Sequence, residues 1–125
     1  MTEVSVPVAG KGEGSAYLKH RHPASSYAVV GVAAIVTLKN EHIKSARLVV
    51  GGVTPNPLVV AKVEEVLRGQ KPSPKLFSDA AASVAEAIQD PLGDLYASGE
   101  YRIHLATVMA RRALQEAVAR AKKQK

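Results

Sequence analysis

The chain has 125 residues, the size of a single domain. Hydrophobic residues make up 46% of it but aromatic residues only 4%, so the core must be built from small side chains, and few rings remain for stacking on nucleic acid. The absence of cysteine excludes disulfides, a thiolate nucleophile and cysteine-bound zinc, and it favours a cytoplasmic protein.

The formal net charge of +6 arises largely near the C-terminus. The basic residues there are Arg111, Arg112, Arg120, Lys122, Lys123 and Lys125. Cations near a helix C-terminus complement the helix dipole, so this cluster favours a solvated helix end. The alternative is a stand-alone nucleic-acid-binding module, which would need its cations in one exposed stripe beside stacking groups. The cations are spread and the aromatics sparse, so the pattern argues against nucleic acid.

The N-terminal part predicts a short strand, a glycine-rich loop and a second strand. Val4, Val6 and Val8 alternate with other residues, and Pro7 confines such a strand to an edge. Residues 10–14 read GKGEG, which superficially resembles a phosphate-binding loop. A phosphate loop of that kind ends in Gly-Lys-Ser/Thr and opens a helix, whereas residues 15–19 read as strand.

Residues 19–27, KHRHPASSY, form a polar and positive segment that is bent by proline. His20 and His22 would share one face of a strand and could offer two imidazoles to a metal. No residue spacing supplies a third ligand, so metal binding stays a minor alternative. Two interpretations remain open: a plain solvated loop, or a cationic loop that contacts an anionic or electron-rich ligand.

The centre of the chain predicts an antiparallel hairpin. Residues 28–38 are an almost unbroken apolar run, as in a buried strand, and residues 39–42 form a polar turn. Residues 43–50 then alternate as a second strand. A glycine in mid-strand, Gly31, indicates a close approach by another element, so a larger residue there should overpack.

The longest apolar run, of about eleven residues, is too short to span a membrane, which takes roughly 20 residues.

Three helices are predicted after the hairpin. The first begins at an Asn56 N-cap with Pro57 at its first position and ends at Gly69. After a linker over residues 70–75, Ser78 caps the second helix, which stops at residues 90–91, and the third runs from Ser98 to about Lys122. The predicted buried stripes are Val59, Val63, Val66 and Leu67, then Phe77, Ala81, Val84 and Ile88, then Tyr101, Leu105, Val108, Met109 and Arg112, with Ala106, Ala110, Ala113 and Ala117 allowing close packing.

This order of elements predicts an α+β fold: an antiparallel sheet of three or four strands followed by three helices packed on one face. No pair of acids, and no grouping of Ser, His and Asp, has a spacing that signals catalysis. We therefore predict no catalytic residues for the chain by itself.

Four segments in order resemble a known family. They are RHPASSYAVVGVAA, ARLVVGGVTPNPL, VEEVLRG and EYRIHLATVMARRAL. They are similar to the C-terminal domain of flavoprotein (medium) subunits of molybdenum hydroxylases, such as carbon monoxide dehydrogenase and xanthine dehydrogenase. The resemblance covers residues 2–119 and implies one α+β domain over residues 1–125.

The resemblance also implies a cofactor and partners. In that family FAD is held mainly by an upstream domain with glycine-rich loops, and the lysine of the Tyr-x-Lys strand approaches the flavin. That lysine is Lys19 here, and Arg21 is the weaker candidate for a flavin contact. The implied partners are an FAD-binding domain, an iron–sulfur subunit and a molybdopterin subunit. Since the FAD-binding domain is not in this sequence, we expect the chain alone to bind no FAD and to lack activity. A structural dimerisation module, or a homodimer of the isolated chain, is the remaining alternative.

Overall fold

The computed structural model describes residues 12–21, 28–54, 56–88 and 99–123. It contains a four-stranded antiparallel sheet in the order β1-β2-β3-β4, followed by three helices, so the predicted α+β class is confirmed. The strands are β1 (Glu13–Arg21), β2 (Ala28–Lys39), β3 (His42–Gly51) and β4 (Leu58–Val59). The helices are α1 (Ala61–Leu67), α2 (Pro74–Ala87) and α3 (Gly99–Lys123). The strand predicted around Val4 and the segments around Asp90 and Ser98 lie outside the described residues.

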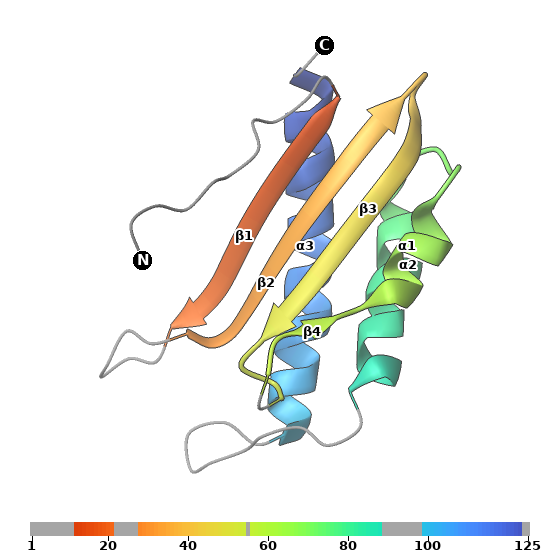
Figure 1. Ribbon diagram of the computed structural model, residues 1–125. Coiled ribbons are helices and arrows are strands. Elements are labelled where there is room, and N and C mark those ends of the chain that lie inside the picture. Colours follow the sequence, from red (N-terminus) through yellow and green to blue (C-terminus); the bar gives the residue numbers. More distant parts are fainter. Residues whose placement is uncertain (1–11, 22–27, 55, 89–98, 124–125) are drawn as a thin grey trace.

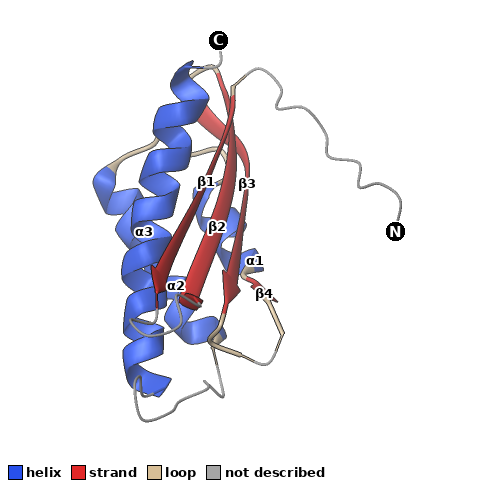
Figure 2. Cartoon of the chain, turned by 90° about the vertical axis from the view of Figure 1, so that its left-hand side faces the viewer, coloured by secondary structure: helices blue, strands red, loops and turns tan. Residues whose placement is uncertain are grey.

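The helices pack on one face of the sheet (Figures 1 and 2). α3 runs behind β1 and β2, α1 contacts β3, and α2 packs against both other helices. The core is built from aliphatic and small side chains of both layers, and Val30, Val32, Val36 and Leu48 of the sheet are fully buried. The alanines of α3 expected to allow close packing are all buried, as is the stripe predicted for α2. Small side chains therefore let the helices approach the sheet closely.

The hairpin is confirmed, with one irregularity that strict alternation did not predict. β2 and β3 are joined by Asn40 and Glu41, which both have positive φ (52° and 66°), as in a two-residue hairpin turn. Thr37 pairs with Ser45 but Leu38 pairs with Ile43, so Lys44 is an extra residue without a partner in β2. This bulge places Ile43 on the same buried face as Ala46, three residues later.

The predicted start of the first helix is wrong. Leu58 and Val59 instead pair with β3 as the short strand β4, and the Val60 N–H donates to the Leu48 carbonyl at 2.9 Å. The chain thus stays extended past Asn56 and Pro57, and α1 begins only at Ala61. Sheet pairing overrides the local capping signal. Val63 and Leu67 are buried as expected, and Gly69 has φ 78°, as predicted for the residue after a helix end.

The predicted cap of the second helix is also wrong. Ser73, not Ser78, caps α2: its side chain accepts a hydrogen bond from the Leu76 N–H at 3.1 Å, and Pro74 takes the first helical position. The Ser-Pro pair satisfies an N-terminal donor and presets the backbone, so the helix starts inside the predicted linker.

The buried face of α3 differs from the predicted stripe. Tyr101 is 42% exposed and Arg112 is exposed, whereas Arg102 is 9% exposed and donates from Nη1 to the Gly52 carbonyl at 2.9 Å. The alanine row sets the face because small side chains permit the closest approach to the sheet, and Leu114 is fully buried on the same face.

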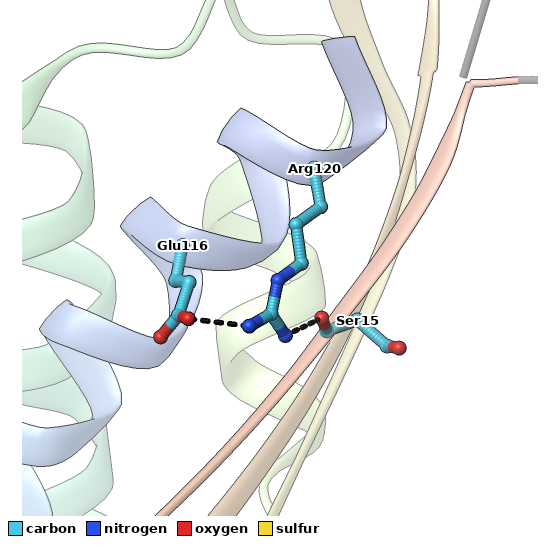
Figure 3. A network of polar contacts seen from close by, with 3 residues as sticks. All are labelled: Ser15, Glu116 and Arg120. Atoms are coloured by element: carbon cyan, nitrogen blue, oxygen red, sulfur yellow. Dashed lines mark hydrogen bonds and ion pairs between the residues drawn. The ribbon is translucent and has the colours of Figure 1, made fainter. Parts of the chain in front are cut away.

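Near the C-terminal end of α3, Arg120 connects the helix to the first strand (Figure 3). Its Nη1 donates to the backbone carbonyl of Ser15 at 2.7 Å, and its Nη2 pairs with Glu116 at 2.6 Å. The five basic residues predicted for a solvated helix end and described by the structure are all exposed: Arg111, Arg112, Arg120, Lys122 and Lys123.

Candidate functional site

Lys19, the sequence-predicted site residue, lies on the sheet face that is turned away from the helices. Side chains alternate along β1, so Ser15, Tyr17 and Lys19 share this open face, whereas Ala16 is buried against the helices. Lys19 belongs to β1, as the strand predicted over residues 15–19 requires, and its side chain is exposed.

Beside Lys19 the open face carries no side chain at two neighbouring positions. Lys19 pairs with Gly31 of β2, and Gly31 pairs with Gly51 of β3. A Cβ at Gly31 would lie 2.6 Å from the hydroxyl oxygen of Tyr17. The Tyr17 ring therefore lies over Gly31, which is the residue of β2 that pairs with Lys19. The close approach predicted for Gly31 is confirmed, and the approaching group is the side chain of Tyr17 from the neighbouring strand β1.

The next row of the open face is apolar and crosses the whole sheet. Tyr17 pairs with Ala33, Ala33 with Val49, and Val49 with Val59. Tyr17 and Val59, at the two ends of this row, are 59% and 56% exposed, and Ile35 on the same face is 45% exposed. Exposed apolar side chains gathered on one face are typical of an interaction surface. We call Tyr17, Ala33, Val49 and Val59 the apolar row.

The other predicted residues of this region are separated from Lys19. His20 points to the helix side, where its ring meets Tyr101 of α3 edge-on with centroids 6.4 Å apart. Arg21 ends β1 and pairs with Ala28, but its side chain, like His22, lies outside the described part. Within the described ranges, no three His, Asp or Glu side chains form a group that would hold a metal. None of the described helices has the length and hydropathy to cross a membrane.

The sequence of residues 15–117 matches the family described as the CO dehydrogenase flavoprotein C-terminal domain. The chain belongs to this family. The predicted resemblance to flavoprotein subunits of molybdenum hydroxylases is therefore confirmed over most of the chain.

Two medium chains of known name are similar to this sequence. The chain is 35% identical to the carbon monoxide dehydrogenase medium chain of Afipia carboxidovorans, over 98% of this chain and 42% of that protein. It is 32% identical to the glyceraldehyde dehydrogenase medium chain of Sulfolobus acidocaldarius, over 93% of this chain and 41% of that protein. The chain thus spans about two fifths of the length of these relatives.

Solved structures match the fold closely. Carbon monoxide dehydrogenase from Hydrogenophaga pseudoflava lacking the Mo-pyranopterin moiety superimposes with a TM-score of 0.85 and 27% identity, over 92% of this chain and 40% of that one. Cu,Mo-CO dehydrogenase in its cyanide-inactivated form superimposes with a TM-score of 0.82 and 30% identity, again over 92% of this chain and 40% of that one.

Reasoning from the sequence singled out Lys19 but missed Tyr17. The two residues are two apart on one strand, so they must share a face. The available signal was the position of Tyr17 between Ala16 and Leu18, which places its aromatic ring on the face opposite to these two apolar neighbours. What the sequence did not indicate is that Gly31 and Gly51 lie side by side next to Lys19.

Proposed function

We propose that this flavoprotein domain covers one side of the FAD site in the intact medium subunit. The open sheet face at the Lys19 end would be turned toward the isoalloxazine. The observation that carries the proposal is that Lys19 and Tyr17 lie next to Gly31 on the open face.

The residues of this surface suit a flat, electron-rich cofactor. The aromatic ring of Tyr17 lies over Gly31 next to Lys19, and Gly51 beyond it adds no side chain to this face. A flavin supplies electron transfer when bound, and its reduced form carries negative charge. The Lys19 ammonium would stabilise that charge, and Arg21 at the end of β1 is the second candidate cation.

The apolar row supports a role in assembly. Its exposed ends, Tyr17 and Val59, lie on the same open face as Lys19. We propose that the flavin-binding domain packs on this face, and that the subunit joins an iron–sulfur and a molybdopterin subunit in the complex. For the isolated chain we expect no FAD binding and no activity of its own. With its partner domain absent, the row is also the surface that a homodimer would use.

The test is a redox titration of the domain reconstituted with the FAD-binding part of its subunit. Lys19→Met keeps the length and apolar stem of the side chain but removes the charge. The flavin midpoint potential should fall by about 20 mV for a two-electron couple, as expected for roughly 1 kcal/mol from one partly screened charge. Lys62→Met, at an exposed lysine of α1, is the matched control and should leave the potential unchanged. If Lys19→Met leaves the potential of bound flavin unchanged, the proposed contact is wrong.

A further inference from the structure

A groove of about 700 Å³ lies at the other end of the sheet from Lys19. Its walls come from the start of β1, the β2–β3 turn, the segment before α2 and the last turn of α3. Glu13 pairs with Thr37 at this end, and Lys19 is six residues further along β1, or about 20 Å away. The groove is therefore separate from the proposed flavin surface.

Four lysines line this groove: Lys39, Lys44, Lys71 and Lys122. Glu41 is the acidic residue among the lining residues, so the lining carries a net charge of +3 (four cations less one carboxylate). Within the described part of the chain, none of the four lysines makes a hydrogen bond or an ion pair. Four cations that border one groove without partners repel one another, and a bound anion would relieve that repulsion.

The backbone fixes the positions from which these lysines project. Lys44 is the bulged residue of β3. The segment that carries Lys71 is held against β3 by two hydrogen bonds: Ile43 N–H donates to the Gln70 carbonyl at 2.9 Å, and Gly69 N–H donates to the Ile43 carbonyl at 2.7 Å. Gly12 is held against β2 by a bond from Leu38 N–H at 2.8 Å.

The helix dipole explains only one of the four lysines. Lys122 lies in the last turn of α3, where a cation complements the helix C-terminus. Lys39, Lys44 and Lys71 come from β2, β3 and the segment before α2, so that effect does not account for their position in the same groove. The volume is within the range of small-molecule sites, and Thr37 and Asn40 add neutral hydrogen-bonding groups to the lining.

We propose that this groove binds a small, multiply charged anion, a phosphate- or carboxylate-bearing metabolite. Lysine ammonium groups bind phosphate and carboxylate oxygens as point charges with three donors each. Glu41 and the terminal carbonyls of α3 oppose an anion, so the four lysines must outweigh them. The ligand is held by charge rather than by apolar burial, and its affinity falls as salt rises.

Calorimetric titration of the full 125-residue chain with inorganic triphosphate and with citrate, at low and high salt, tests this proposal. We expect one saturable site per chain, and the ratio of the two affinities will distinguish a phosphate from a carboxylate ligand. The double variant Lys44→Ala/Lys71→Ala should weaken binding about tenfold, because each exposed pair contributes a few-fold. Glu41→Gln should strengthen binding about two- to threefold.

The matched control is Lys62→Ala/Lys123→Ala. It removes the same charge from two exposed lysines, one on α1 and one next to Lys122, that do not line the groove. It should change the affinity less than twofold. The absence of saturable binding by both anions would overturn the proposal, and so would equal weakening by the two double variants, which would indicate diffuse attraction to a basic protein.

Discussion

The two faces of the sheet are made by the same strands but obey different constraints. On the helix side, valines, alanines and a leucine are buried to nearly zero exposure under the helices. On the open side, Tyr17, Ile35 and Val59 are about half exposed. Two glycines show the difference most clearly. A side chain at Gly14 would collide with the backbone of α3, whereas a side chain at Gly31 would meet only the side chain of Tyr17. The helix side is therefore determined by the fold itself, and the open side is left for what packs on it.

The largest expected effect is that of Gly14→Ala. A Cβ at Gly14 would lie 2.1 Å from the carbonyl oxygen of Ala117 and 2.3 Å from the backbone nitrogen of Ala121. A helix backbone cannot rotate aside, so α3 would have to move off β1. We expect a loss of about 3 kcal/mol or more in the free energy of unfolding, measured by urea denaturation. Ser15→Ala, at the exposed neighbour, should stay within about 0.5 kcal/mol. A stable Gly14→Ala variant would mean that the helix and strand are further apart than described.

An intermediate effect is expected for Arg102→Met. The change keeps much of the buried aliphatic stem but removes the donor to the Gly52 carbonyl, which links α3 to the connection after β3. We expect a loss of about 1–2 kcal/mol by the same measurement. Arg112→Met on the exposed side of α3 is the control and should stay within about 0.5 kcal/mol. Equal losses for the two variants would contradict the orientation of α3 described here.

The smallest effect is expected for Gly31→Ala. A Cβ there meets the hydroxyl end of Tyr17, which is 59% exposed and free to rotate into solvent. We expect a loss below about 1 kcal/mol, less than overpacking against a rigid element would cost. In a Tyr17→Ala background the same change should be nearly neutral, because the double-mutant cycle removes the contact. A loss as large as that of Gly14→Ala, in either background, would show that the two faces do not differ as proposed.

The sequence predicted the hairpin and the α+β order well, because apolar runs and turn residues are local signals. It misplaced two helix starts for different physical reasons. Asn56 and Pro57 have the chemistry of a helix start, but Leu58 and Val59 pair with β3, and this pairing keeps the chain extended. Ser73 with Pro74 is a better helix start than Ser78, but the two prolines within residues 70–75 indicated a linker there.

The face of α3 and the candidate sites were harder to predict. Alanines surround much of α3, so the pattern did not distinguish Arg102 from Arg112 as the buried arginine. Lys19 came from the family resemblance alone, and no spacing along the chain indicates the groove. Its lysines come from separate elements, and a one-residue bulge at Lys44 has no sequence signal that periodicity detects.

The contact between Arg120 and Ser15 has a consequence for solubility. β1 is the outermost strand of the described sheet, so its outer backbone groups offer a template to a strand of another molecule. Arg120 occupies the Ser15 carbonyl with a guanidinium that is itself held by Glu116. An incoming strand would have to displace a charged donor at that position. A surface arginine thereby occupies one acceptor on the outer side of β1, within the described sheet, and disfavours the pairing of another strand at that position.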